Sequence, residues 1–210
     1  SAGWSDGETI VTLMNSRGFS GQFRRSGFSI SCAPVAQQRG KKQTEYWYTH
    51  KRHLKDLETP RQVGKKAAER SVRMLGARPV KSGKYPVIFE QRVAGGFWSS
   101  VSGALNGESV LRRRSFLCES LGKPIASSQV TLLDDGLLKA GIGSRPFDGE
   151  GVPARKKYLI RSGKLRQFLY NSYTARRAGT ESTGNAVRGY QSTPGIGCQN
   201  LYLQSGNVSP

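Results

Sequence analysis

The amino-acid sequence predicts an α+β fold in two parts: a mixed sheet-and-helix part, then a mainly antiparallel β part. Short segments that alternate apolar and polar residues fill much of the first fifty positions, which is typical of half-buried strands. A helix with start and stop signals follows at 59–76, and a strand-turn-strand pattern returns at 156–170. The 210 residues suffice for one large domain or two small ones.

The first part is expected to open as an antiparallel meander of three strands. Their apolar or β-branched centres are Thr9–Leu13, Phe28–Cys32 and Tyr46–Thr49. Turn-forming residues separate these centres, Asn15–Gly18 after the first strand and Arg39–Lys42 before the third.

The helix at 59–76 carries the clearest local signals in the sequence. Thr59 can cap its start, Pro60 suits the first helical position, and Gln62 can close a capping box onto Thr59. Apolar or small residues recur at steps of three or four and predict one buried face, made of Val63, Ala67, Ser71 and Met74–Leu75. Gly76 stands where a left-handed C-terminal cap is needed.

The segment 78–84 is the best candidate for a domain boundary, which gives domains at 1–79 and 80–210. The second domain should begin with a strand at Tyr85–Phe89 and a helix from about Gln91 to Leu105. The buried face of that helix is expected to consist of Val93, Phe97, Val101 and Leu105. Its three internal glycines indicate that a neighbour packs against the backbone. Strands are then expected at 130–133, 156–161 and 164–170, the last two joined by a turn at Ser162-Gly163.

The chain is strongly basic, with 33 Lys and Arg against 14 Asp and Glu and a formal charge of +19. Such a protein binds polyanions non-specifically at low salt, because phosphate contacts release counterions. The excess is spread evenly, with 15 basic and 6 acidic residues in 1–79, whereas nucleic-acid readers usually cluster theirs. A solvated basic surface is therefore the favoured interpretation.

Several classes of protein are excluded or disfavoured. No stretch of 18 apolar residues is present, so we expect no membrane-spanning helix. The first residues do not have the pattern of a signal peptide, and the absence of an initiating Met suggests a processed, trimmed or incomplete chain. Three widely spaced cysteines make neither a disulfide framework nor a zinc knuckle, and they fit reduced thiols in a cytosol.

Few residues offer self-contained chemistry. His50 and His53 could hold a metal on one helix face, but the lysines and arginines around them oppose this, so surface histidines are favoured. Asp148 and Glu150 could do acid-base work or bind a backbone amine, although hydrogen bonding within their own glycine-rich loop is favoured. Asp134-Asp135-Gly136 is interpreted as a turn, and the Trp47 region as either a base-stacking platform or core.

Two segments resemble signature segments of the PmbA/TldD family, long labelled modulators of DNA gyrase. They are Gly143–Pro153, which reads GSRPFDGEGVP, and Glu181–Ala186, which reads ESTGNA. The resemblance extends from about Thr9 to Leu203 with its segments in the same order. It implies that 1–79 is the C-terminal part of an N-terminal α/β domain. It also implies that 80–210 is the first part of a β-rich C-terminal domain.

The resemblance also implies a cytoplasmic protease. In one branch of the family, two histidines and a glutamate in an H-E-x-x-x-H helix act with a bound zinc ion. The sister branch, PmbA or TldE, lacks those ligands and pairs with the first branch. The corresponding helix here, Gly95–Gly107, contains neither histidine nor carboxylate.

These implications predict a non-catalytic subunit with no catalytic residue, no metal site and no cofactor of its own. Zinc would be carried by a TldD-type partner, and the substrate would be an unfolded or short peptide. The residues expected to touch the peptide are Ser144, Arg145, Asp148, Glu150 and Asn185. Two alternatives stay open: a nucleic-acid-binding or gyrase-modulating protein without a protease role, and a stand-alone hydrolase using His50 or His53.

Overall fold

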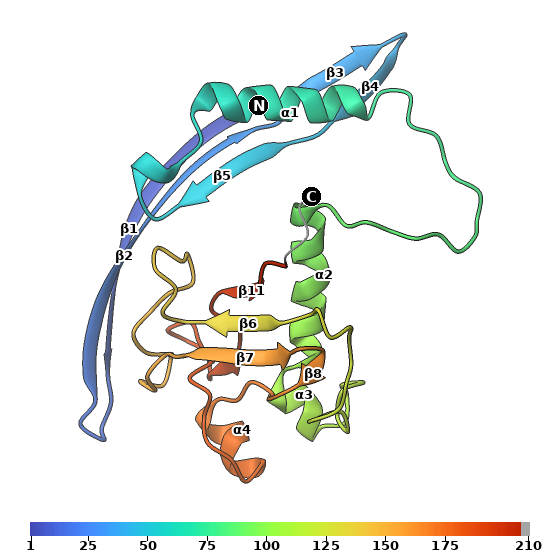
Figure 1. Cartoon of the computed structure of the whole chain (residues 1–210). Coiled ribbons are helices and arrows are strands. Elements are labelled where there is room, and N and C mark those ends of the chain that lie inside the picture. The colour runs from blue at the N-terminus through green and yellow to red at the C-terminus, as the bar shows by residue number, and fades with distance from the viewer. Residues whose placement is uncertain (207–210) are drawn as a thin grey trace. The chain divides into compact units, whose positions relative to one another are not determined.

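The computed structural model describes residues 1–206, and its fold is α+β, as the sequence predicts (Figure 1). The chain forms two compact units. One contains residues 1–11 and 24–87, and the other contains residues 12–23 together with the chain from Ile88 onward. Across residues 1–206, no helix is both long and apolar enough to cross a bilayer.

A sheet in the order β1-β2-β5 is formed by β1 (Ala2–Met14), β2 (Ser20–Cys32) and β5 (Trp47–Lys51). The first unit contains this sheet except for the hairpin tip at residues 12–23. Strands β2 and β5 are antiparallel, with Ile30 opposite Thr49. The predicted meander is wrong in one respect, because a separate hairpin of β3 (Val35–Gln38) and β4 (Lys41–Thr44) interrupts it. Its turn residues Arg39 and Gly40 both have positive φ, which suits a tight two-residue turn and pairs β3 with β4.

Helix α1 (Pro60–Arg73) follows a short 3-10 turn, η1 (Leu54–Asp56), and lies against β3 and β5. Its predicted caps are confirmed. The capping box of Thr59 and Gln62 is formed, and Gly76 has a φ of +78°. The buried residues of the helix are Val63, Ala67 and Ser71. The predicted face ends there, because Met74 is exposed and Leu75 is half-buried.

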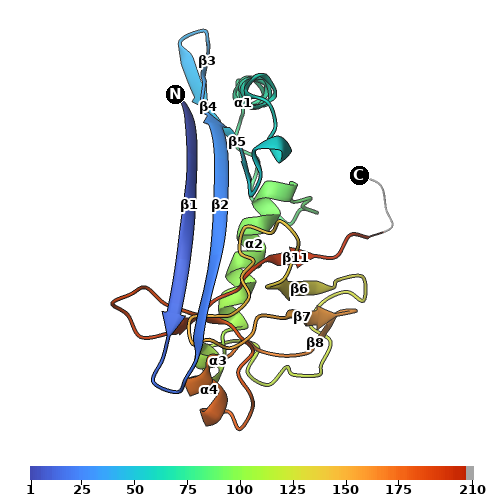
Figure 2. The same cartoon turned by 90° about the vertical axis from the view of Figure 1, so that its left-hand side faces the viewer.

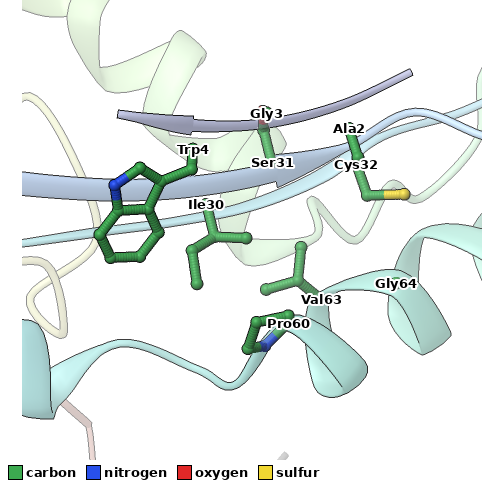
Figure 3. Close-up of a pocket in the computed structure, with 9 residues that line it drawn as sticks. All are labelled: Ala2, Gly3, Trp4, Ile30, Ser31, Cys32, Pro60, Val63 and Gly64. Atoms are coloured by element: carbon green, nitrogen blue, oxygen red, sulfur yellow. The ribbon is translucent and has the colours of Figure 1, made fainter. Parts of the chain in front are cut away.

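An apolar cavity of about 350 Å³ separates the first turns of α1 from β1 and β2 (Figure 3). Trp4, Ile30 and Val63 line it, together with Pro60 and Cys32. The side chains of Trp4 and Ile30 therefore lie on the face of the sheet that α1 covers.

The predicted strand at Tyr85–Phe89 is wrong. This segment has no regular secondary structure, and Ile88 is 99% exposed. Pro86 has no amide hydrogen for a strand ladder, and none of the described strands pairs with the segment.

The second unit combines helices with short strands (Figures 1 and 2). Its main sheet has the order β11-β6-β7-β8, and neighbouring strands are antiparallel. These strands are β6 (Leu132–Asp135), β7 (Lys156–Arg161), β8 (Lys164–Leu165) and β11 (Leu201–Leu203). A second, two-stranded sheet pairs β9 (Ala186–Val187) with β10 (Gly195–Ile196). The helices are α2 (Gln91–Ala104), α3 (Gly107–Leu111) and α4 (Ser172–Arg177).

The predicted turn at Ser162-Gly163 is confirmed, since both residues have positive φ between β7 and β8. The strand after it is shorter than predicted. Beyond Leu165 the chain leaves the sheet, and Phe168 and Leu169 enter the hydrophobic core instead.

The core of the second unit lies between α2 and the main sheet, and it includes Leu105, Leu132, Leu159 and Leu165. Helix α2 faces this core through Trp98, Val101, Ala104 and Leu105, whereas Val93 and Phe97 are about half exposed. The predicted inward face is therefore wrong over the first half of the helix. A Cβ added at Gly95, Gly96 or Gly103 would meet nothing within 4 Å among the described residues, so the expected neighbour is absent there.

Candidate functional site

The glycine-rich loop that joins β6 to β7, residues 136–155, contains four of the five residues predicted to bind peptide. Asp148 lies inside it and is only 2% exposed. Its carboxylate accepts hydrogen bonds from the amides of Glu150 (2.9 Å), Val152 (3.0 Å) and Ala186 (2.8 Å). Burial raises the pKa of the Asp148 carboxyl, and the amide hydrogen bonds oppose that shift. Asp148 therefore shapes the loop from within.

Phe147 anchors the same loop to the tip of the β1–β2 hairpin, which belongs to the second unit. Its ring makes edge-to-face contacts with Phe19 and Phe23 at centroid distances of 5.1 and 5.3 Å. Gly21 permits this approach, because a Cβ there would lie 2.7 Å from the Phe147 ring. The loop is thus held by aromatic packing from a segment more than 120 residues earlier in the chain.

Glu150 is half-buried and connects the loop to α4. Its Oε2 accepts a 2.7 Å hydrogen bond from the amide of Ser172, the first residue of the helix. Asn171 caps the same helix and accepts from the amide of Thr174. Because a carboxylate near a helix N-terminus is favoured by the helix dipole, Glu150 stabilises α4.

Ser144 is half-buried and sits where Asn200 organises the start of the loop. Its Oγ donates to the carbonyl of Leu138 (2.6 Å) and accepts from Asn200 Nδ2 (2.9 Å). Asn200 Oδ1 in turn accepts from the amide of Gly143 at 2.8 Å. A Cβ at Gly143 would lie 1.9 Å from the carbonyl oxygen of Gln199, so this close approach requires glycine.

Arg145 is also half-buried, and its amide donates to the carbonyl of Gly136 at 3.0 Å. Ser144, Arg145 and Glu150 are therefore the predicted peptide-binding residues that keep part of their surface exposed. A direct contact with peptide stays a prediction for all five.

Asn185, the fifth predicted residue, is fully buried beside Asp134 of β6. Its Nδ2 donates to Asp134 Oδ2 (2.7 Å) and to the carbonyl of Gly197 (2.9 Å), and its Oδ1 accepts from Thr183 (2.9 Å). Asp134 Oδ1 also accepts from the amide of Gln199 at 2.7 Å. The prediction that Asp134-Asp135 is a plain turn is wrong, because both residues are buried within β6.

Lys157 completes this buried polar network from β7, directly across from Asp134. Its Nζ lies 3.3 Å from Asp134 Oδ2, and the two side chains are 2% and 0% exposed. Burial lowers the pKa of Lys157, and the neighbouring Asp134 carboxylate opposes that shift. The ion pair thus links neighbouring strands at the base of the candidate loop.

Sequence reasoning missed the other members of the Asn185 network, which are Asp134, Lys157, Thr183 and Gln199, and it missed Asn200 beside Ser144. One signal was present. Lys157 and Leu159 are two positions apart in β7, so both side chains point to the same, buried face. The partners on the loops at 183–200 carry no comparable periodic signal.

The two histidines do not form a site. His50 lies in β5 and His53 precedes η1, so they do not share a helix face as a metal pair would require, and both are exposed. Among residues 1–206, no group of three or more His, Cys, Asp and Glu side chains could hold a metal ion.

Helix α2 does not have the chemistry of a zinc site. From Gly95 to Ala104 its side chains are aromatic, aliphatic, hydroxyl or absent, whereas zinc in proteins binds imidazole, thiolate or carboxylate. Cys198 packs against the core that this helix faces, and its side chain interacts with Ser102 of the helix. Burial and the nearby Asp134 carboxylate raise the pKa of the Cys198 thiol to about 12. This set of helix residues does not fit a zinc ion.

Comparison with known proteins identifies the class to which this fold belongs. Residues 1–75 match the family model for the PmbA/TldA metallopeptidase central domain, and residues 82–210 match the model for the C-terminal domain. The chain therefore belongs to the PmbA/TldD family of metalloproteases.

Curated relatives support this assignment. Metalloprotease PmbA of Escherichia coli O157:H7 is 38% identical over 177 residues, which cover 84% of this chain and 39% of the relative. A TldD homologue of Buchnera aphidicola is 32% identical over 144 residues, covering 68% of this chain and 30% of the relative. The chain thus spans about two fifths of the length of PmbA.

Solved structures share the fold. A protein of Bacteroides thetaiotaomicron described as a modulator of DNA gyrase is 28% identical, with a TM-score of 0.86 over 98% of this chain and 44% of its own. TldE of Thermococcus kodakarensis has a TM-score of 0.85 over 99% of this chain and 47% of its own; at 24% identity it shows the fold alone.

Proposed function

We propose that this chain is a non-catalytic subunit of a TldD/TldE-type zinc metalloprotease in the cytoplasm. In this role it lines the chamber and binds the backbone of unfolded or short peptides. A zinc-carrying TldD-type subunit supplies the hydrolysis. The family membership and the fold shared with a TldE support this proposal.

The observation that carries the proposal is the chemistry of α2. A metalloprotease of this family needs metal ligands and a general base on the corresponding helix, and α2 has residues of neither kind. If the chain takes part in peptide hydrolysis, another polypeptide must therefore provide the catalytic groups.

The candidate peptide surface is the exposed side of the loop at residues 141–153. Bare glycine backbone allows an extended peptide to approach closely. The half-buried Arg145 can orient a peptide carbonyl or carboxylate, and Ser144 and Glu150 lie on the same loop. Asp148 and Asn185 contribute by fixing the loop from below.

The test compares peptide hydrolysis by three samples: this chain alone, a zinc-carrying TldD-type protein alone, and the two mixed. An unstructured fluorogenic peptide is the substrate, and bound zinc is measured in each purified protein. We expect turnover in the mixture that exceeds the sum of the separate proteins, with zinc bound to the TldD-type protein. Turnover and one zinc per molecule in this chain alone would overturn the proposal.

The role of the loop is tested in the same mixture with Arg145→Ala. Arg166→Ala is the matched control, because Arg166 is an exposed arginine outside the loop. We expect Arg145→Ala to raise KM about fivefold or more while Arg166→Ala leaves it unchanged. Equal KM values for the two variants would show that Arg145 does not bind the peptide.

A further inference from the structure

The sheet of the first unit is covered by α1 on one face. Trp47 points toward the helix, with Lys66 Nζ and Arg70 Cζ lying 4.9 and 5.5 Å from its ring centre. Thr49, two residues along, is buried on the same side. Because side chains alternate along a strand, Tyr46, Tyr48 and His50 lie on the opposite face, which we call the open face.

Two tyrosines form an aromatic ridge on the open face. The rings of Tyr46 and Tyr48 are stacked, with centroids 6.2 Å apart and planes inclined by 11°. Tyr46 is 57% exposed and Tyr48 43% exposed, so both rings present area to solvent. His50, which is also exposed, continues the same row.

Small polar residues of β2 form a floor beside this ridge. Ser31 lies opposite Tyr48, and Ser29 lies opposite His50. Gly27 comes next on the same face, where a Cβ would lie 3.2 Å from His50 Nε2. By the same alternation Arg25 follows Gly27, so the open face combines aromatic rings, hydroxyl groups and a cation.

Four carboxylates of this unit lie on the side of α1. Glu58 pairs with Lys66 at 2.8 Å, and Glu45 with Arg70 at 3.7 Å. Strand β1 turns Trp4 toward the cavity beside α1 (Figure 3), so Asp6 and Glu8 share that side. Among the described strand residues of the open face there is no carboxylate. A face without anions on a chain of net charge +19 is complementary to a polyanion.

We propose that the open face binds single-stranded nucleic acid, a function beyond the protease role. Bases stack on Tyr46 and Tyr48, and the phosphates lie near Arg25 and the serine hydroxyls of β2. This combination of exposed rings and positive charge is the one that single-strand binders use. A peptide that adds a strand to a sheet binds at the edge of the sheet. The rings of Tyr46 and Tyr48 stand on its face, where bases can stack.

The experiment measures the binding of a fluorescein-labelled ten-nucleotide oligodeoxythymidylate by fluorescence anisotropy. The salt concentration is ~0.15 M, the physiological ionic strength. The variant is Tyr46→Ala with Tyr48→Ala. The matched control is Tyr85→Ala with Tyr190→Ala, which removes two exposed tyrosines from elsewhere. We expect the open-face variant to bind about tenfold more weakly or worse, and the control to bind as the parent does. Tyr46→Phe with Tyr48→Phe, which keeps both rings, should restore binding.

Stacking is separated from charge by a second oligonucleotide of equal length that lacks bases. We expect it to bind at least about tenfold more weakly than the thymidylate, because its phosphates remain but its rings are gone. Equal affinity for the two oligonucleotides, or equal loss in the alanine and phenylalanine pairs, would overturn the proposal. The proposal would also be overturned if a labelled unstructured peptide bound to the protein, lost this binding in the Tyr46→Ala, Tyr48→Ala variant, and was not displaced by the thymidylate.

Discussion

The side-chain amide of Asn185 donates a 2.7 Å hydrogen bond to Asp134 Oδ2, although the two residues are 51 positions apart in the sequence. Both side chains are fully buried, and Lys157 Nζ lies 3.3 Å from the same carboxylate oxygen. One anion therefore joins β6, β7 and the loop before β9. The polar network is part of the fold of the second unit, and it supports the candidate loop above it.

Removing the anion should be costly. Asp134→Ala leaves the Lys157 ammonium buried without its carboxylate, so we expect a loss of about 3–5 kcal/mol in the free energy of unfolding, measured by urea denaturation. Asp56→Ala, which removes an exposed carboxylate, should change stability by less than about 0.5 kcal/mol. Replacing the pair together, as Asp134→Leu with Lys157→Met, should recover only part of the loss, because the Gln199 amide and Asn185 Nδ2 still lose their acceptor. A loss of less than 1 kcal/mol in Asp134→Ala would contradict the assigned role.

Two glycines should respond in opposite ways to the same added methyl group. Gly143→Ala places a Cβ against the carbonyl oxygen of Gln199, so the loop must move and we expect destabilisation by about 2 kcal/mol or more. Gly95→Ala, in α2, meets open space and should stabilise the helix by up to about 1 kcal/mol. Thermal unfolding of both variants checks this. A Gly143→Ala protein as stable as the parent would contradict this, because it would show that the loop can move away from Gln199 without cost.

The aromatic anchor is tested by local dynamics. Phe147→Ala removes the ring that Phe19 and Phe23 contact, and we expect faster amide hydrogen exchange in residues 12–23 and 141–153. Phe116→Ala is the control, because Phe116 is 80% exposed. Unchanged exchange at the hairpin tip in Phe147→Ala would mean that other contacts hold the loop.

The thiol of Cys198 should resist alkylation. Thiolate is the reactive form, and the pKa of about 12 leaves very little of it at pH 8.5. We expect iodoacetamide to label Cys198 about a hundredfold more slowly in the folded protein than in urea, as followed by peptide mass spectrometry. Labelling at the unfolded rate would contradict the shift.

The same shift sets a direction for stability against pH. The raised pKa favours the protonated thiol in the folded state, so its contribution is complete below the ordinary value of 9.0. Above pH 9 the unfolded chain loses the proton while the folded chain keeps it. Stability is therefore lost as pH rises toward about 12. When the pH is raised from 8 to 10, the free energy of unfolding should fall less in Cys198→Ala than in the parent, because the variant has no thiol at this position to titrate.

The sequence predicted correctly those elements whose caps and turns are formed by residues close together in the chain. The capping box of Thr59 and Gln62, the spacing of Val63 and Ala67, and the glycine cap specify α1 without reference to distant residues. The turn at Ser162-Gly163 is specified in the same way, by two residues that take positive φ.

The failures have a common physical cause, since they depend on contacts between distant segments. The segment Tyr85–Phe89 has strand-forming residues but no described partner strand. Helices α3 and α4 are too short for periodicity to reveal, and they depend on caps from Asn106 and Asn171. Asp134 looked like a turn residue, because its partners Lys157, Asn185 and Gln199 lie 23 to 65 positions away.

The hydrogen bonds of Asn200 to Gly143 and Ser144 have a consequence during protein synthesis. The ribosome produces residues 136–153 well before it produces Asn200. At roughly 5–20 residues per second, the glycine-rich loop waits several seconds for the side chain that secures its first turn. Strand β6 precedes the loop and β7 is made within that interval, so the Asp134–Lys157 pair can form while β11 is still missing. Nascent chains stalled before residue 200 should therefore be cleaved by protease within this loop, and chains stalled well beyond it should be protected.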